Sequence, residues 1–396
     1  MPRQRVLVVG ASVAGPALAF WLVRAGYEVV VAEAATQLRL GGNGVDIRDQ
    51  AIAVVEQMAL IDQIRLCAMN PIGFRFAGRD GRARTTVHLA TLQGRAGYED
   101  IEISRGDLAR LLYEATRENA DYRFATAVES FVQDADGVTV TFAGGGSERF
   151  DLLIGADGLH SQIRRLAFPR REPLRFRKHY FAFATSDSAL SEPGWVTFYN
   201  RPGLSVAAGR REGGPDQVHF MFRSEKPLVY DYRDTPTQRR LATEAFAGAD
   251  WFPRAFMSAI EAPDFYFDAL SQVRLPVWSK GRVALVGDAA YSASPASGAG
   301  ALLALVGAYR LAGELAVAGG NHRAAFRNYE AAHRPLVARK QRGLFTGISV
   351  PATAFGIWAR NQMLASPLVG VLSGMAPSRV APLKRYDFPP RDILGA

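Results

Sequence analysis

The sequence predicts an α/β fold (α+β overall): a Rossmann-like domain, a second domain with a mainly antiparallel β-sheet, and C-terminal helices. Three observations predict it. The chain opens with strand, glycine turn, helix and strand patterns, as in a βαβ unit. From about residue 176 to 273, apolar and polar residues alternate in short runs, as in half-exposed antiparallel strands. The 396 residues, 48% of them hydrophobic, can bury a core large enough for two lobes.

Each element has its own signal along the chain. Alternating apolar residues predict strands, apolar residues at helical spacing predict helices, and Gly or Asp-Gly pairs predict turns. Ser104 and Asp107 have the spacing of a capping box, so a helix should begin there. In order, we expect a strand over 5–10, a helix to about 25, a strand over 28–33, a helix over 49–60, a hairpin at 80–81, a helix from 104, a strand-rich region over 122–155, helices over 236–247 and 253–262, a strand over 283–286, a long helix from about 298, a basic helix and two apolar C-terminal helices.

Composition excludes several classes of protein. The single cysteine, Cys67, excludes a disulfide framework, and the N-terminus shows no basic-then-apolar leader, so we expect a cytoplasmic protein. Arg310 and Glu314 interrupt one apolar stretch and Arg360 another, so we expect no membrane span. The net charge of +9 comes without a nucleic-acid-binding module, and no histidines have metal-ligand spacing. We therefore expect neither a nucleic-acid partner nor a metal, in a monomer or homodimer.

The first glycine corner, VVGASVAGPALAF, has the pattern of a dinucleotide site. Gly10, Ser12 and Gly15 fill the three positions of G-x-G-x-x-G, with serine in place of the second glycine. Glu33 ends the second strand, where a carboxylate can accept the hydroxyls of an adenosine ribose and disfavours a 2′-phosphate. The corner therefore predicts a bound dinucleotide other than NADP.

Two further corners follow buried strands. In LLIGADGLHSQIRR, Asp157 and Gly158 follow one such strand, and taken alone this is a simple turn. In VALVGDAAYSASPASGAGALLALVGAYRLAGEL, Asp288 stands among small residues before a long helix that we expect to begin near Gly298. The start of a helix favours a negatively charged group, and small residues let the backbone approach a flat ring. A flavin fits this corner, with Asp288 on its ribityl hydroxyls, and a tight helix–sheet packing joint is the alternative.

With these three motifs in this order, the chain resembles the FAD-dependent class A aromatic hydroxylases, flavoprotein monooxygenases with the p-hydroxybenzoate hydroxylase fold. Its length is similar to that of the compact members that modify tetracyclines or rifamycins. The resemblance implies a FAD-binding domain over 1–72, 96–172 and 275–345, a substrate-binding β-sheet domain over 73–95 and 173–274, and a C-terminal helical segment over 346–396. The sequence departs from the family pattern at Tyr291, Leu302 and Gly307.

The resemblance also assigns roles to individual residues. Glu33 would bind the AMP ribose, Arg105 the FAD phosphate region, Val128 the adenine through its backbone, and Asp288 the ribityl chain. Asp157 would serve both FAD and the reduced nicotinamide. The implied cofactor-contacting residues are Gly10, Ser12, Val13, Ala14, Gly15, Glu33, Ala34, Arg105, Val128, Asp157, Asp288, Pro295, Gly298, Ala299, Gly300 and Ala301.

The activity implied by the resemblance is hydroxylation of an aromatic or polycyclic small molecule with O2 and NADPH or NADH. Hydride would pass to FAD, and a flavin hydroperoxide would transfer one oxygen atom to the substrate. This role requires no catalytic acid–base pair from the protein. Two alternatives stay open: a flavin-dependent dehydrogenase or reductase of the same fold, and a non-catalytic FAD-containing protein that binds a ligand.

The substrate should bind against the second domain's sheet. If HYFAFA and HFMFR are strands, Phe181 and Phe183 share one face, as do Phe220 and Phe222. These four phenylalanines are either a substrate wall or ordinary core. The histidines that could deprotonate a substrate are His88, His160, His179 and His219, and a structural role is the alternative for each.

Overall fold

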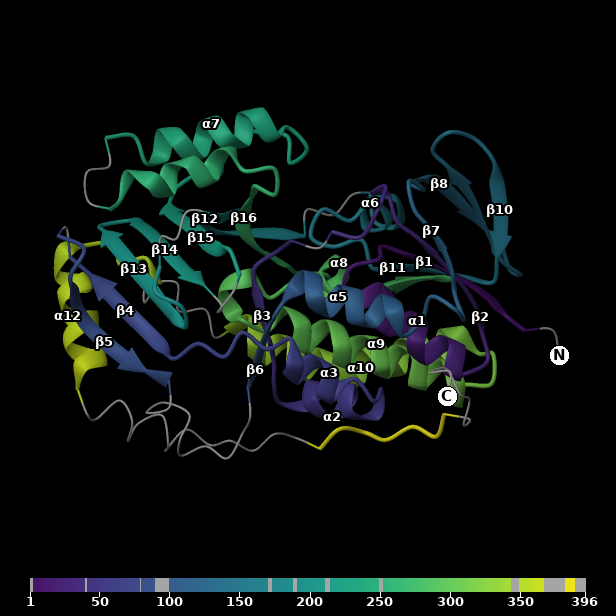
Figure 1. Cartoon of the computed structure of the whole chain (residues 1–396). Helices are drawn as coiled ribbons and strands as arrows, with labels where there is room; N and C mark the ends of the chain where they lie inside the picture. The colour runs from purple at the N-terminus through teal and green to yellow at the C-terminus, as the bar shows by residue number, and fades with distance from the viewer. Residues whose placement is uncertain are drawn as a thin grey trace.

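Two lobes lie side by side in the structure, a computed structural model (Figure 1). The residues that it describes are 3–39, 41–78, 80–89, 100–169, 173–187, 191–210, 214–248, 252–342, 349–366 and 382–388. One lobe contains a parallel sheet and the long helices, and the other contains a large sheet beneath helix α7. The chain is thus an α/β protein with a second, mainly antiparallel domain.

The first lobe is built on a six-stranded sheet. Its order is β17-β18-β11-β1-β2-β7, all parallel except the edge strand β17. The strands are β1 (Arg5–Val9), β2 (Glu28–Ala32), β7 (Asp121–Arg123), β11 (Leu152–Gly155), β17 (Ser279–Lys280) and β18 (Val283–Leu285). Since helices cover both faces, Val6, Leu7 and Val8 are fully buried, as expected for a continuous apolar run.

Helices and two small sheets complete this lobe. The helices are α1 (Ala14–Arg24), α2 (Gln50–Gln57), α3 (Ile61–Leu66), α5 (Arg105–Glu114), α6 (Gln162–Ala167), α8 (Asp288–Tyr291), α9 (Gly300–Val317) and α10 (His322–Arg342). The small sheets pair β3 (Gly44–Ile47) with β6 (Ile101–Ser104), and β8 (Val128–Gln133), β9 (Val138–Phe142) and β10 (Ser147–Phe150) with one another. The predicted capping box is present, because Ser104 Oγ accepts from the Asp107 amide at 3.2 Å.

The second lobe is built on a seven-stranded sheet, in the order β16-β12-β15-β14-β13-β4-β5. Only β13 and β4 pair in parallel. The strands are β4 (Gly73–Ala77), β5 (Ala83–His88), β12 (Leu174–Ser186), β13 (Trp195–Arg201), β14 (Leu204–Arg210), β15 (Asp216–Arg223) and β16 (Tyr266–Val273). Helix α7 (Thr235–Ala245) and the 3₁₀ helix η1 (Arg254–Glu261) pack on one face, and the predicted hairpin joins β4 to β5.

The structure corrects two predicted boundaries and the type of one helix. The long helix begins at Gly300 and not at Gly298, because Pro295–Ser297 form a 3₁₀ turn (η2) that ends at Gly298 with a φ of +57°. The helix expected over 49–60 is α2, which ends at Gln57, and a separate helix, α3, begins at Ile61, since Ala59 adopts a φ of +58° between them. The second helix expected over the sheet is the 3₁₀ helix η1.

Of the expected pair of C-terminal helices, the described residues contain one, and the rest of this prediction falls on a segment that includes residues 346–348, 367–381 and 389–396, which lie outside the described ones. Helix α12 (Ala354–Ala365) packs against β5 and β13, whereas 382–388 is irregular and crosses α9. There Tyr386 and Lys384 both donate to Glu314, at 2.7 and 2.6 Å. One described helix, α9, has the length and composition of a membrane span, and 83% of it is buried in this fold.

Candidate active site

The three corners predicted from the sequence meet at a single edge of the parallel sheet. Gly10 follows β1, Asp157 follows β11 and Asp288 follows β18, and these strands are neighbours. A Cβ on Gly10 would lie 2.6 Å from the Ala156 carbonyl oxygen, so the first two corners touch. Ligands of open α/β sheets bind at this carboxyl edge. The structure therefore brings together residues that the sequence separates by more than half of the chain.

The first corner is shaped by its glycines and held by Glu33. Gly10 has a φ of +110°, and a Cβ on Gly15 would overlap the Gly10 carbonyl oxygen. The Glu33 carboxylate accepts from the amides of Ala11 and Ala35, at 2.8 and 2.9 Å. Helix α1 has no side-chain cap, and exposed Ser12 stands beside its start. Its first amides are therefore free to bind an anion.

The third corner presents Asp288 and the start of α9. The Asp288 side chain is accessible to solvent but lies in a recess below the protein surface. The surrounding protein raises the pKa of its carboxyl group, whereas the hydrogen bond with Ser292 and the charges of Arg105 and Arg164 lower it. Gly300 is exposed although nearly all of α9 is buried, and no described atom lies within 4 Å of a Cβ placed there. The helix start has no side-chain cap. An anionic or carbonyl edge of a flat ligand fits this place.

Two residues that the sequence analysis missed complete the third corner. Arg48, which follows β3, donates to the carbonyl oxygens of Ser297 and Gly298 at 3.0 and 2.8 Å. Asp46 Oδ2 lies 3.6 Å from Arg48 Nη1 and 2.7 Å from a Cβ placed on Gly298. The only signal was the loop sequence GGNGVDIR, which gives no indication that it pairs with β6 and reaches Gly298.

The second corner holds a helix and leaves its carboxylate little freedom. Asp157 accepts from the Ser161 hydroxyl and from the amides of Gln162 and Ile163, at 2.5, 2.6 and 3.0 Å. The acid thereby stabilises the start of α6 against the edge of the sheet. The contact with cofactor expected of Asp157 stays a prediction, and this bonding favours its backbone over its side chain.

Two more of the residues predicted to contact the cofactor, Val128 and Arg105, lie close to these corners. Val128 is the first residue of β8. It lies near Glu33, because two residues earlier the Thr126 amide donates to the Glu33 carbonyl at 2.8 Å. Arg105 begins α5, packs against Gly42 and lowers the pKa of Asp288 through its charge. An extended nucleotide needs an acid for its ribose, amides and a cation for its phosphates, and an open helix start for its ring. These residues fit FAD. Glu33 would hold the ribose, the α1 amides and Arg105 the phosphates, and the start of α9 with Asp288 the flavin end.

A cavity of about 320 Å³ lies between the β3–β6 pair and the seven-stranded sheet. Its wall is mostly apolar and aromatic with a few polar groups, as in sites for small organic molecules. The lining residues are Asp46, Met69, Pro71, Phe74, Glu102, Phe181, Gly194, Trp195, Val196, Phe198, Ser205, Ala207, Gly209, Arg210, Gln217, His219 and Met221.

Only one face of the sheet borders this cavity, which corrects part of the predicted substrate wall. Phe181 lines the cavity, and Phe183 packs with it in the same small cluster. Phe220 and Phe222 point to the opposite face and pack under α7, with Phe246 5.4 and 6.2 Å from their ring centres. They are core residues, because the alternation that puts His219 in the cavity turns Phe220 away from it.

The four candidate histidines differ in position. His219 lies in the cavity between the rings of Phe181 and Phe183, and burial lowers its pKa to about 4. His160 Nε2 lies 2.7 Å from Asp268 Oδ2 of β16. His179 is buried with Nδ1 2.8 Å from the Arg177 carbonyl oxygen, and His88 is exposed on β5. Only His219 can meet a ligand in this cavity.

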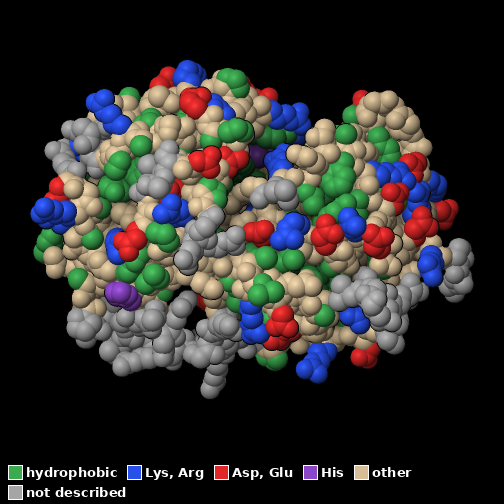
Figure 2. All heavy atoms as spheres, viewed as in Figure 1, with side chains coloured by type: hydrophobic (Ala, Val, Ile, Leu, Met, Phe, Trp, Pro, Cys, Tyr) green, Lys and Arg blue, Asp and Glu red, His purple; other side chains and the backbone are tan. Residues whose placement is uncertain are grey.

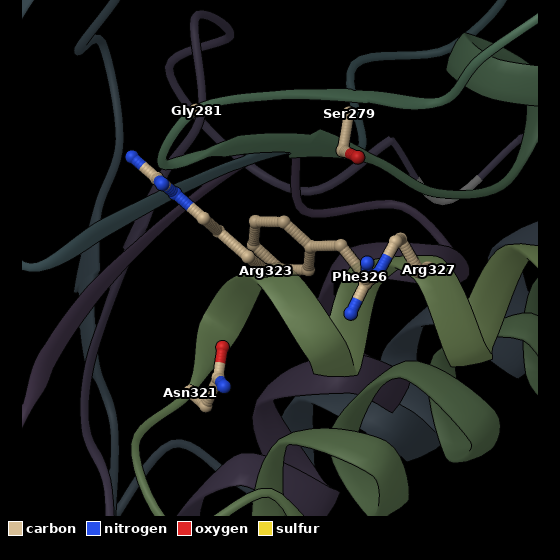
Figure 3. Close-up of a pocket in the computed structure, with 6 residues that line it drawn as sticks. All are labelled: Ser279, Gly281, Asn321, Arg323, Phe326 and Arg327. Atoms are coloured by element: carbon tan, nitrogen blue, oxygen red, sulfur yellow. The ribbon is translucent and has the colours of Figure 1, made fainter.

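A second hollow, of about 520 Å³, lies at the opposite end of β18 (Figure 3). It is lined by Ser279, Gly281, Asn321, Arg323, Phe326 and Arg327, and in Figure 3 Arg323 and Phe326 point from α10 toward the strands. It is open to solvent and lies at the amino end of β18, away from the three corners. On the face seen in Figure 2, acidic and basic side chains are interspersed.

Comparisons with known proteins agree with this geometry. The sequence model of the FAD binding domain family matches residues 3–246. A flavin-dependent monooxygenase from Legionella longbeachae is 36% identical over 91% of this chain and 90% of its own. The crystal structure of the tetracycline destructase Tet(51) has a TM-score of 0.82 and 32% identity, over 94% of this chain and 98% of its own. Klebsiella pneumoniae HpxO, solved with FAD and uric acid, has a TM-score of 0.72 and 25% identity, over 94% of this chain and 95% of its own.

The matched family covers more than half of the chain, and the relatives and solved structures cover nearly all of it. Both agree with the resemblance that the three motifs indicated. The chain therefore belongs to the FAD-dependent monooxygenases of the aromatic hydroxylase family.

Proposed function

We propose that the chain hydroxylates an aromatic or polycyclic small molecule, using NADPH or NADH and O2, with FAD bound along the three corners. The balanced reaction inserts one oxygen atom into the substrate, reduces the other to water and oxidises one reduced nicotinamide. Bound FAD would supply the redox chemistry. The chain itself would bind the ring of the substrate, orient it and keep water away.

One observation carries this proposal: Asp46 belongs to both the cavity and the third corner. It lines the cavity, and its Oδ2 lies 2.7 Å from a Cβ placed on Gly298. The cavity therefore opens next to the place where a flavin ring fits. A ligand in this cavity would lie beside the ring.

The polar residues of the cavity suggest how a phenolic substrate is held. His219 is neutral at neutral pH, because burial holds its pKa at about 4. Its ring can accept a hydrogen bond from a phenol and so favour the electron-rich form that oxygen insertion needs. The Arg210 Nε is buried without a partner among the described residues, and it can donate to a carbonyl or enolate oxygen of the ligand.

The test follows the fate of oxygen. The FAD-loaded protein is supplied with NADPH, isotopically labelled O2 and a panel of phenols, tetracyclines and other polycyclic ligands, and products are analysed by mass spectrometry. We expect one labelled atom in the product, and a loss of this activity in His219→Asn that is absent in the control His322→Asn, at the start of α10 and outside the cavity lining. NADPH oxidation without labelled product across the panel would indicate a dehydrogenase or reductase. No turnover would indicate a ligand-binding flavoprotein.

A further inference from the structure

One wall of the cavity carries two carboxylates that face each other across a strand pair. Asp46 on β3 and Glu102 on β6 are direct cross-strand partners, and both line the cavity. Side chains that are directly opposite have Cβ atoms about 4.5–5.5 Å apart, where like charges destabilise the sheet. This arrangement is unfavourable for the fold alone.

The described cations near this wall pair with Asp46 and Asp49, and not with Glu102. Arg48 Nη1 lies 3.6 Å from Asp46, and Lys340 donates to Asp49 at 2.7 Å. No described residue forms an ion pair or a hydrogen bond with the Glu102 carboxyl group. Burial and the charge of Asp46 raise the pKa of Glu102 from 4.5 to about 7. Among the described residues, Glu102 therefore has no partner for its negative charge.

Gly44 leaves room for the Glu102 carboxyl group. A Cβ on Gly44 would overlap Glu102 Oε1. The Glu102 carboxyl group therefore lies over Gly44, on the neighbouring strand β3. Gly44 does not have a positive φ, so it is not required for its backbone conformation. Its lack of a side chain leaves room for the acid.

The rest of the wall suits an organic cation. Phe74, Phe181, Trp195 and Phe198 line the same cavity, and aromatic faces attract organic ammonium groups. A metal ion needs more ligands, and the described residues contain no cluster of three or more His, Cys, Asp or Glu side chains that could hold one. Arg210 lies in the wall formed by the seven-stranded sheet, so the cavity has groups of both charges.

We propose that Asp46 and Glu102 are a specificity site for a basic nitrogen, so that the substrate is an aromatic compound carrying a protonated amine. The proposal rests on the proposed function, because it places this amine in the cavity beside the flavin site. Glu102 would form the charge-assisted hydrogen bond to the ammonium, and Asp46 would add its charge.

The test compares two ligands that differ only in charge. The oxidised FAD-loaded protein is titrated with a naphthol that carries a dimethylaminomethyl group and with the same naphthol carrying an isobutyl group, following the flavin absorbance. We expect the amine to bind about tenfold more tightly, the scale of one hydrogen bond to a charged group. Equal binding, or tighter binding of the isobutyl ligand, would overturn the proposal while leaving the proposed function intact.

Three variants separate binding from folding. Glu102→Gln should abolish the preference for the amine with little change for the isobutyl ligand. Gly44→Ala keeps the charge but displaces the carboxyl group, so it should weaken the preference. Glu129→Gln, which removes an exposed acid on β8, is the matched control and should keep it. An unchanged preference in Glu102→Gln would contradict the assignment.

Calorimetry gives a readout that a purely structural Glu102 would not change. Burial raises the pKa of Glu102 to about 7, so the carboxyl group can carry a proton near neutral pH, and a bound ammonium would lower this pKa and release that proton. The binding enthalpy of the amine should therefore depend on the ionisation enthalpy of the buffer in the wild type but not in Glu102→Gln. Buffer-independent enthalpy would overturn the proposal. If neither naphthol perturbs the flavin, the cavity does not bind aromatic ligands, and the proposed function fails with the inference.

Discussion

Replacement of Gly10 by alanine should both destabilise the fold and release the cofactor. The new side chain would be forced to a φ of +110° and would lie 2.6 Å from the Ala156 carbonyl oxygen, although real Cβ contacts essentially never fall below 3.0 Å. A positive φ costs about 1–3 kcal/mol and an overpacked contact about 1–3 kcal/mol. We therefore expect the free energy of unfolding to fall by about 2–6 kcal/mol.

Gly145→Ala provides a matched control for this experiment. Gly145 has a similar φ of +100°, but no atom lies within 4 Å of a Cβ placed there, in the turn between β9 and β10. This variant should show only the cost of the φ, about 1–3 kcal/mol by urea unfolding, and should bind FAD as the wild type does. Gly10→Ala should also lose at least about tenfold in FAD affinity, because the turn must move and its amides leave the phosphates. If both variants have equal stability and FAD affinity, the account of this corner is wrong.

Three further predictions follow from the site. Asp288→Asn should keep the fold but weaken FAD binding, because the amide loses the charge that pairs with the ribityl hydroxyls; equal FAD content after dialysis would refute this. Phe220→Ala should cost about 3–5 kcal/mol of stability without changing the affinity of a cavity ligand, whereas Phe181→Ala should weaken that affinity; the reverse pattern would place the substrate on the other face of the sheet. The folded protein holds the Glu102 proton more tightly than the unfolded chain, since its pKa is about 7 and not 4.5. Stability should thus fall as pH rises between these values, by less than about 1.4 kcal/mol per pH unit, and Glu102→Gln should remove this dependence in urea titrations.

The three corners could be predicted because each depends on a short segment. Gly10 and Gly15 are required by the geometry of one turn, and Glu33 follows from the length of one βαβ unit. Their convergence follows from the parallel pairing of β1, β11 and β18, which places the three corners at one carboxyl edge. The start of α9 was misplaced because the positive φ of Gly298 ends one short helix before the next begins.

The cavity could not be predicted in the same way. Alternation along β15 gives two faces, but nothing in the strand says which face α7 will cover, so Phe220 and His219 could not be told apart. Asp46 and Glu102 are distant in sequence, and only the register between β3 and β6 makes them partners. Such sites depend on long-range pairing, which a local pattern does not contain.

The most direct test is the flavin content of the protein as purified, followed by FAD titration of any colourless fraction. We predict a yellow protein with one FAD per chain, bleached by NADPH faster when an aromatic ligand is present. A protein that is colourless and does not take up added FAD would contradict the claim that the three corners bind one extended flavin nucleotide.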